Sequence, residues 1–562
     1  MKQCPECSRT YADDTLNYCL DDGASLVYGP AEPATAILTP DRLANEDPTR
    51  IFAPSATPEN DSPPETARPT TSKRNSIIAA VFGIILVTAL AVGSYIYYGR
   101  GVSKQIESIA VMPFSNESGN ADIEYLSDGL TETLINSLTE LPNLNVKPRS
   151  SAFRFKDRET DAKTIGRELN VGAILNGRLV TRGDEFTLFL ILVDTGSENQ
   201  IWGKQYTRKL ANLVALQNEI VRDVSDSLRT KLTETDVRAG KNQTANPEAY
   251  RLYLQGRFHW NKRTRGDIER AVEYFQQSTA LDPQFALAYS GLADSLSMLS
   301  NYKGTPAHQS MAAARSAAEK ALSLDPDLAE AHTALGNILF GYDHDFTGAE
   351  REYKRAAELN PEYAPAHQMY GLMLGCLGRH DEALAGYRRA LDIEPVSLPI
   401  NRGYGIALIY ARKYDESARQ FRKTIELDPA FPLAHFGLAQ ALTLQQKYPE
   451  SADAYAKGLE VGGSPAEAAR LREAFATGGW IGYLRTRLQL RQVGPTPQPH
   501  YVRAASFVHL GDKASAIAAL NKSFEDREGL FTALNVEPTF DLLRGEPGFM
   551  ELVRKLGLPE NR

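Results

Sequence analysis

Cysteine is scarce in this chain of 562 residues, which has only four, at positions 4, 7, 19 and 376. Three lie close together and one stands alone, so a disulfide scaffold is excluded and a metal site in a reducing compartment is indicated. A surplus of positive charge is also missing, because Lys and Arg number 62 against 70 Asp and Glu. Since nucleic-acid binders need such a surplus to neutralise phosphates, the composition argues against nucleic acid as a partner.

Catalytic sequence motifs are missing as well. The chain has no phosphate loop of the form G-x-x-x-x-G-K-[ST], no H-E-x-x-H, no H-R-D with a following D-F-G and no G-x-S-x-G elbow. These absences argue against an enzyme, and no small-molecule substrate is evident.

Long apolar runs are limited to one, which excludes a multi-span membrane protein. This run lies in residues 76–98 and has neither charge nor proline from Ile77 to Tyr98. At ~1.5 Å per residue it is long enough for the hydrocarbon core of a bilayer, and tyrosines crowd its C-terminal end. We therefore expect a transmembrane helix at 76–98. A buried core helix is the alternative, and the long preceding segment argues against a cleaved signal peptide.

Basic residues flank this span unevenly. Arg68, Lys73 and Arg74 precede it, whereas Arg100 and Lys104 follow it. The positive-inside rule and the reduced cysteines both favour an N-terminus in the cytoplasm. We expect a single-pass protein of the bacterial inner membrane whose C-terminal part is extracytoplasmic.

The clustered cysteines have the spacing of a zinc ribbon, which we place at residues 1–28. Cys4 and Cys7 form one knuckle, and Cys19 begins a second that ends at Asp22. A carboxylate can complete a tetrahedral Zn²⁺ site, so we predict a structural zinc held by Cys4, Cys7, Cys19 and Asp22. Asp21 could replace Asp22 as the ligand, and a degenerate ribbon without metal is the alternative.

Two further regions separate the ribbon from the repeats described below. Residues 29–75 are rich in proline and predict a disordered linker. Residues 106–235 predict an α/β domain with a partly antiparallel sheet. We expect strands at Ser108–Phe114, Leu144–Lys147, Val171–Val180, Glu185–Val193 and Ile201–Tyr206, an amphipathic helix at Asp122–Leu141, and further helices at Ala162–Leu169 and Leu213–Leu232.

Residues 247–463 contain a repeat with the period of tetratricopeptide (TPR) units. Prolines that end similar tripeptides recur at Pro283, Pro326, Pro361, Pro395 and Pro429, mostly 34 residues apart. Small residues and one aromatic recur inside each unit, as expected where two helices pack closely. We expect an all-α TPR solenoid here and a helical, TPR-like region at 464–562. His332, His367 and His435 fall at one repeat position, so we assign them to packing, and we expect Cys376 to be a buried or groove-lining free thiol.

Residues 106–232 resemble the TolB amino-terminal-like, or FlgO-like, domain. The resemblance rests on Ser108–Phe114, Tyr125–Glu132, Ile165–Val171, Gly177–Val180, Gln200–Tyr206 and Leu216–Ile220. It implies a periplasmic domain that precedes TPR repeats and often follows a membrane span joined to a DNA-binding, kinase or cyclase module. In this chain only the small ribbon stands in that place, and Asp22 replaces the last cysteine of similar bacterial ribbons.

These features together predict a multidomain, membrane-anchored scaffold or signalling adaptor that binds a protein or peptide through its solenoid. The alternative is a membrane-bound transcriptional regulator or sensor whose ribbon contacts nucleic acid or a cytoplasmic partner. Helix A of each TPR unit lines the concave groove, and counting from the repeat prolines places the following residues there: Gln368, Leu372, Arg402, Ile406, Tyr410, Phe436 and Gln440. An ordinary solvated face, or one packed on the α/β domain, is the alternative for this groove.

Overall fold

The computed structural model describes residues 2–3, 10–11, 27–28, 106–139, 141, 144–183, 185–209, 212–228, 244–299, 307–490, 500–526 and 531–558. It contains two units, Met1–Gly99 and Arg100–Arg562. In the first unit, β1 (Lys2–Gln3) pairs antiparallel with β2 (Thr10–Tyr11) and with β3 (Val27–Tyr28). The predicted linker and the predicted membrane helix at 76–98 lie outside the described residues. Within the ranges given above, no helix has the length and apolarity needed to cross a membrane.

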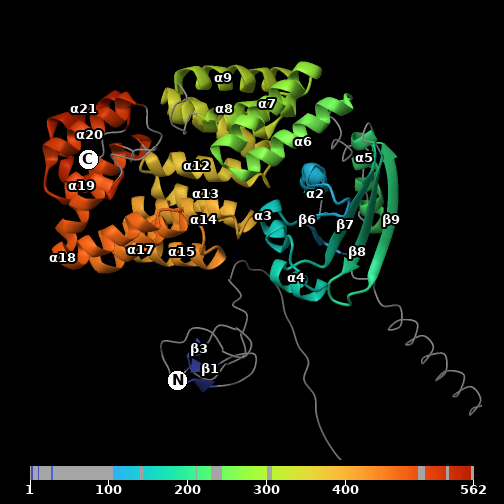
Figure 1. Cartoon of the computed structure of the whole chain (residues 1–562), viewed down its shortest axis with the longest axis horizontal. Helices are drawn as coiled ribbons and strands as arrows, with labels where there is room; N and C mark the ends of the chain where they lie inside the picture. The colour runs from blue at the N-terminus through green and yellow to red at the C-terminus, as the bar shows by residue number, and fades with distance from the viewer. Residues whose placement is uncertain are drawn as a thin grey trace, which may run out of the picture. The chain divides into compact units, whose positions relative to one another are not determined.

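The second unit begins with a mixed sheet, as the sequence predicts (Figure 1). Its strand order is β6-β4-β7-β8-β9, with β5 paired to β7. The pairs β6–β4, β4–β7 and β5–β7 are parallel, and the pairs β7–β8 and β8–β9 are antiparallel. Gly183, at φ +64°, provides the left-handed backbone that the tight β7–β8 turn requires. The strands are β4 (Ser108–Val111), β5 (Ser115–Asn116), β6 (Asn145–Val146), β7 (Ala173–Arg182), β8 (Glu185–Asp194) and β9 (Gln200–Lys209).

Helices cover both faces of this sheet. One face packs on α2 and α5 in a large core that includes Leu134 and Ile220, and the other packs on α4 through Ile165 and Leu169. Asp161 caps α4 by accepting a hydrogen bond from the Thr164 N–H, at 2.8 Å. The helices are η1 (Ala121–Ile123), α2 (Glu124–Thr139), α3 (Arg149–Ala152), η2 (Phe153–Phe155), α4 (Ala162–Leu169) and α5 (Leu213–Ser227).

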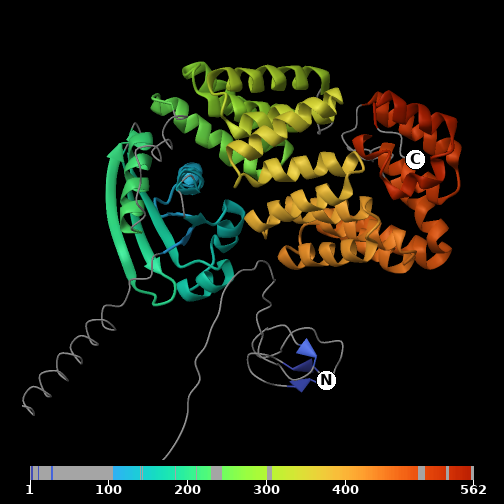
Figure 2. The same cartoon turned by 180° about the vertical axis from the view of Figure 1, so that it is seen from behind.

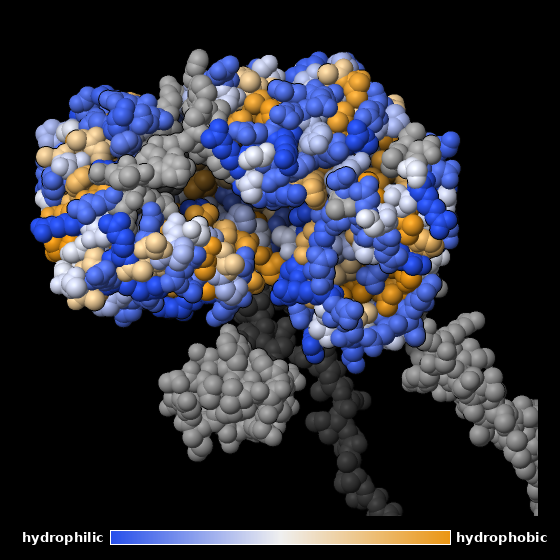
Figure 3. Space-filling view, viewed as in Figure 1, coloured by the Kyte–Doolittle hydropathy of each residue, from blue (hydrophilic) through white to orange (hydrophobic). Residues whose placement is uncertain are grey.

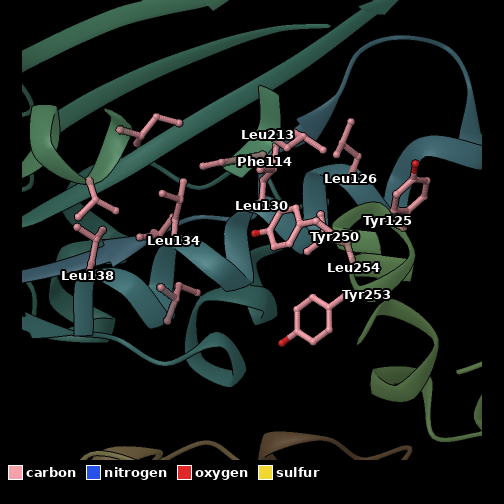
Figure 4. Close-up of a cluster of buried hydrophobic side chains, with 14 of the residues drawn as sticks. Phe114, Tyr125, Leu126, Leu130, Leu134, Leu138, Leu213, Tyr250, Tyr253 and Leu254 are labelled. Atoms are coloured by element: carbon pink, nitrogen blue, oxygen red, sulfur yellow. The ribbon is translucent and has the colours of Figure 1, made fainter. Parts of the chain in front are cut away.

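Helix α2 differs from its prediction. It is buried on nearly all sides, so the prediction of an amphipathic helix is wrong. The cause is a third neighbour, because α2 contacts the sheet, α5 and also α6 (Pro247–Lys262), the first helix after the sheet domain. A Cβ on Gly129 would lie 3.1 Å from Leu254 of α6, so the two helices approach closely. Figure 4 shows Tyr250 and Leu254 against the leucines of α2.

The remainder of the second unit is a helical solenoid, with no strand among described residues 244–558. Antiparallel helix pairs stack side by side (Figures 1 and 2). After α6 come α7 (Arg265–Leu281), α8 (Ala286–Leu299), α9 (Ala307–Leu324), α10 (Ala329–Ile338), the π-helical turn η5 (Leu339–Asp343), α11 (Phe346–Leu359), α12 (Ala364–Cys376), α13 (His380–Ile393), α14 (Leu398–Tyr410), α15 (Tyr414–Leu427), α16 (Pro432–Leu444) and α17 (Tyr448–Val461).

Aromatic rings inserted between small residues hold the solenoid helices together. A Cβ added to Gly256 or to Gly291 would lie within 2.7 Å of the Phe275 ring, so α6 and α8 both need glycine where they face α7. Phe421 of α15 meets Gly437 of α16 in the same way. The predicted packing of small residues on aromatics is therefore confirmed.

The three repeat histidines stabilise the entry to their helices. The Nε2 atoms of His332, His367 and His435 lie 2.9, 2.9 and 3.0 Å from the carbonyl oxygen of the proline six residues earlier. Asn401 takes this role in a fourth unit, donating from Nδ2 to the Pro395 carbonyl oxygen at 2.9 Å. The packing role is confirmed, and the described residues contain no group of three His, Cys, Asp or Glu side chains placed to hold a metal.

The C-terminal helices follow as α18 (Pro465–Leu490), α19 (His500–His509), α20 (Lys513–Glu525), η6 (Phe531–Ala533), η7 (Pro538–Leu543) and α21 (Pro547–Lys555). Residues 531–543, called the closing segment below, pack against α12 and α19. Thr532 of this segment hydrogen-bonds to the thiol of Cys376, whose pKa burial raises to about 12. Cys376 is thus a buried free thiol, as predicted.

Candidate binding site

The solenoid and the α/β domain enclose a concavity of about 2470 Å³. Its walls come from α2 and α3 on one side and from α6, α8, α10, α12 and α14 on the other. Figure 3 shows this face of the molecule hollowed at its centre, with apolar residues beside the hollow. A surface of this kind brings together side chains that are more than two hundred residues apart in the sequence.

A buried ion-pair network joins the two walls at α2 and α6. Arg257 donates to Glu132 Oε1 from Nε at 2.9 Å and from Nη2 at 2.6 Å, and Asn261 donates to Oε2 at 2.8 Å. Arg149 lies 3.1 Å from the same carboxylate. Burial alone would raise the pKa of Glu132, but Arg257 and Arg149 outweigh burial and lower it. Glu132 therefore stays ionised, and its bonds to Arg257 leave that guanidinium committed to the junction.

A second contact joins the walls at the far side of the concavity. Ser150, on α3, donates a hydrogen bond to Glu394 Oε2 at 2.8 Å, across 244 residues of sequence. Glu394 follows α13, so the α/β domain contacts the solenoid both at its first helix and near its middle. Burial raises the pKa of Glu394, and the Ser150 hydroxyl partly offsets that effect.

Three polar side chains that line the concavity have no hydrogen-bond or ion-pair partner in another described residue. Asp294 of α8 and Glu330 of α10 form no ion pair, and neither accepts a hydrogen bond from another described residue. The Tyr253 hydroxyl likewise has no hydrogen bond within the described part of the chain, although the residue is only 7% exposed. Burial raises the pKa of Asp294 to about 6, with Glu330 adding to the shift while Arg257 and Arg263 oppose it. Burial also raises the pKa of Glu330.

Arg402 of α14 stands on another part of the same wall. It is half-buried, and none of the residues that the structure describes forms an ion pair or hydrogen bond with it. Burial lowers the pKa of its guanidinium. A cation that is desolvated without a counter-charge costs free energy, which an anionic ligand group would recover.

Three of the residues predicted from the repeat line this concavity, namely Gln368, Leu372 and Arg402. Ile406 instead packs partly buried against the core between α12 and α16. Phe436 fills the space between α16 and α17, with its ring 4.9 Å from that of Tyr455.

The other two predicted groove residues contact the closing segment. Tyr410 is only 7% exposed and belongs to the core that includes Val536. Gln440 donates to Glu537 Oε2 at 2.9 Å. The chain itself therefore covers this end of the inner face, and the binding role of the whole predicted set stays a prediction.

Sequence reasoning missed Asp294, Glu330 and Tyr253. Asp294 carried a usable signal, because it lies eleven residues after Pro283, as Leu372 does after Pro361. Applying the same eleven-residue offset to Pro283 identifies Asp294 from the sequence. Tyr253 gives no such signal, since its exposure to the concavity depends on how α2 docks on α6.

The predicted zinc ligands cannot be placed in this way. Cys4, Cys7, Cys19 and Asp22 all lie outside the described residues. The described strands β1 and β2 flank the Cys4–Cys7 knuckle and pair Gln3 with Thr10.

Antiparallel helix pairs, a 34-residue period and a proline before each unit define the C-terminal region as a TPR solenoid. Residues 338–397 and 405–469 match the family described as "Tetratricopeptide repeat". Among curated proteins, "Putative adenylate cyclase 3" of Rhizobium meliloti (strain 1021) is 30% identical over 191 residues. That stretch is 33% of this chain, and it spans only 32% of the relative's length.

Several solved structures resemble parts of the chain. A tetratricopeptide repeat protein from Parabacteroides merdae ATCC 43184 is 16% identical, with a TM-score of 0.31, covering 55% of this chain and 99% of its own. Pseudomonas aeruginosa pilF is 22% identical, with a TM-score of 0.30, covering 38% and 93%. YrrB, described as a TPR protein with an unusual peptide-binding site, is 20% identical, with a TM-score of 0.26, covering 36% and 99%.

Proposed function

We propose that this chain is a membrane-anchored, non-enzymatic adaptor that captures a peptide segment of a protein partner in the concavity between its two domains. TPR proteins are generally protein-interaction scaffolds, and the 338–397 and 405–469 repeats belong to that class. The observation that carries the proposal is the desolvated Arg402, which faces the concavity without a counter-charge.

The size and lining of the concavity favour a peptide over a small ligand. Its volume of about 2470 Å³ exceeds the ~300–1,000 Å³ typical of small-molecule pockets. Apolar side chains such as Leu372 and Met369 alternate along the wall with polar ones such as Gln368. An extended peptide can match both kinds of surface.

Capture by the full-length chain tests this proposal. Proteins cross-linked to the detergent-solubilised chain are identified by mass spectrometry, and a peptide of the retained segment is titrated calorimetrically. Arg402→Ala should weaken peptide binding by ~2 kcal/mol or more, because arginine is a typical interface anchor. The matched control is Arg388→Ala, which removes an exposed arginine from the neighbouring helix α13. Equal binding by the two variants would remove this surface from consideration.

The membrane anchor remains part of the proposal through residues 76–98, with the N-terminus in the cytoplasm and the TolB-like and TPR part outside. The charge-free run and its flanking arginines and lysines support it. Reporter fusions after residue 75 and after residue 240 test the topology. Activity of a periplasm-only reporter at the earlier fusion would reverse the orientation.

A structural Zn²⁺ in residues 1–28 is also part of the proposal. The pairing of Gln3 in β1 with Thr10 in β2 supports it, because these two strands bracket the C-x-x-C sequence. Elemental analysis of the reduced full-length chain should give one zinc per chain. Cys4→Ser should lower that value toward zero and Cys376→Ser should not, since Cys376 is buried in the solenoid.

A further inference from the structure

We infer that the peptide captured in the concavity carries a basic side chain, which enters between α8 and α10 and is held by Asp294, Glu330 and the Tyr253 hydroxyl. This inference rests on the proposed function and names the chemistry of its partner.

The three groups come from neighbouring helices of one wall, because α8 contacts both α6 and α10. Tyr253 comes from α6, Asp294 from α8 and Glu330 from α10, which are helices of successive units. All three residues line the concavity, where the Glu330 charge helps to raise the pKa of Asp294. In Figure 4 the Tyr253 ring points away from the packed leucines of α2, and its residue lines the concavity.

Each of these groups has unused hydrogen-bonding capacity. Tyr253 is only 7% exposed, and its hydroxyl gains no hydrogen bond from any described residue. Asp294 and Glu330 are two like charges on contacting helices, and neither forms an ion pair in the described structure. A Lys ammonium or Arg guanidinium would donate to both carboxylates and to the phenol oxygen, and would relieve the repulsion between the carboxylates.

The cations already nearby do not fill this role. Arg257 makes both of its short contacts to Glu132, and that carboxylate also receives Asn261. The Arg263 guanidinium lies 3.5 Å from the centre of the Trp260 ring, and neither arginine forms an ion pair with Asp294. Both arginines therefore reduce the local negative potential, but they leave the two carboxylates without an ion-pair partner.

Arg402 makes the two parts of the inner face differ in charge. It lies on α14, two units beyond α10, so the inner face runs from an acidic part to a basic part. A peptide with a basic residue followed or preceded by an acidic one matches both parts. This polarity distinguishes the occupant from a uniformly basic or uniformly acidic segment.

Blocked nonapeptide pools test the inference on the full-length chain in detergent. Each fluorescent pool is random at eight positions, and the central position is fixed as Lys or Arg in one pool and as Asp or Glu in the other. The wild-type chain should bind the basic pool at least about tenfold more tightly, which corresponds to about 1.4 kcal/mol. Asp294→Asn with Glu330→Gln should remove that preference while thermal melting stays unchanged or rises.

The matched control carries the same change of charge on the outer surface. Glu358→Gln with Asp453→Asn neutralises two exposed carboxylates, 68% and 73% exposed, and should keep the preference. A wild-type chain without preference, or an inner double variant that keeps it, overturns the inference while Arg402-dependent binding still supports the proposed function. If the chain binds neither pool, both the inference and the proposed function are contradicted. If spermidine displaces the basic pool and binds as tightly as that pool does, the site binds a free polyamine, and the inference of a peptide ligand is overturned.

Discussion

The inner face of the solenoid differs sharply between its two ends. Where Tyr410 of α14 and Gln440 of α16 lie, the closing segment covers the inner face, and Glu537 accepts hydrogen bonds from Gln440 and from Thr539. At the end formed by α6 to α10, Asp294 and Glu330 accept no hydrogen bond from any other described residue. Both ends bury carboxylates, and burial raises the pKa of Glu537 as it does that of Asp294.

The difference shows how an internal contact and a binding site can be told apart on one surface. Where the chain covers its own groove, polar groups are matched because unmatched ones would cost folding free energy. Where polar groups stay unmatched, the folded chain bears a cost that a ligand can recover. The open end therefore has the properties of a site, and the closed end those of a core.

The largest loss of stability should come from a substitution that weakens the packing of the closing segment on the helices beneath it. Phe540 is fully buried, with its ring centre 5.1 Å from that of Tyr501, so Phe540→Ala should destabilise the C-terminal helices by ~3–5 kcal/mol. Leu542, in the same segment, is 67% exposed, and Leu542→Ala should change stability by less than ~0.5 kcal/mol. Hydrogen exchange of the α19 and α20 amides measures both. Similar protection in both variants would show that the closing segment is not part of the core.

Neutralising one carboxylate at each end should give effects of opposite sign. Asp294→Asn should raise the free energy of unfolding at pH 7.5 by about 1 kcal/mol, because it removes a charge that burial and Glu330 disfavour. Glu537→Gln should lower it by about 1 kcal/mol, because the carboxylate oxygens accept from Thr539 and Gln440. Urea unfolding of the two variants and the wild type decides this. A loss of stability in Asp294→Asn would contradict the unmatched state of the open end.

The direction in which stability changes with pH follows from the pKa of Asp294. The folded pKa of Asp294, about 6, lies above its ordinary value of 3.8. The folded state therefore binds the proton more tightly, and the associated stability is full below pH ~4 and is lost as the pH rises through about 6. The surrounding charges are Arg257 of α6, Arg263 directly after α6, and Glu330 of α10. The advantage of Asp294→Asn should accordingly vanish near pH 4 and appear between pH 5 and 7, roughly.

Much of the architecture could be predicted from the sequence because it is local or periodic. The β7–β8 hairpin follows from alternation and one turn glycine, and the repeat follows from prolines and small residues at fixed spacing. The histidine positions could be interpreted for the same reason, since equal spacing in a solenoid means equal surroundings.

The candidate site could be predicted only in part, because it depends on contacts between distant segments. Arg402 was found from the repeat offset, but Tyr410 lies beneath a segment more than a hundred residues later in the chain. Helix α2 was misjudged because nothing local indicates that α6 covers its second face. Long-range closure of this kind leaves no period in the sequence.

The smallest expected effect is a difference in stability between variants of two tyrosines that lie one turn apart on α6. Tyr250 donates its hydroxyl to Gln217 Oε1 at 2.5 Å, inside the junction with the α/β domain, so Tyr250→Phe should lower the free energy of unfolding by ~1 kcal/mol. Tyr253→Phe should change it by less than ~0.5 kcal/mol, because that hydroxyl has no hydrogen bond to lose within the described structure. The order should reverse in peptide titrations, where Tyr253→Phe weakens binding of the basic pool and Tyr250→Phe does not. Equal costs in unfolding would mean that the Tyr253 hydroxyl is already satisfied, and the open end would then lose one of the three groups that define it.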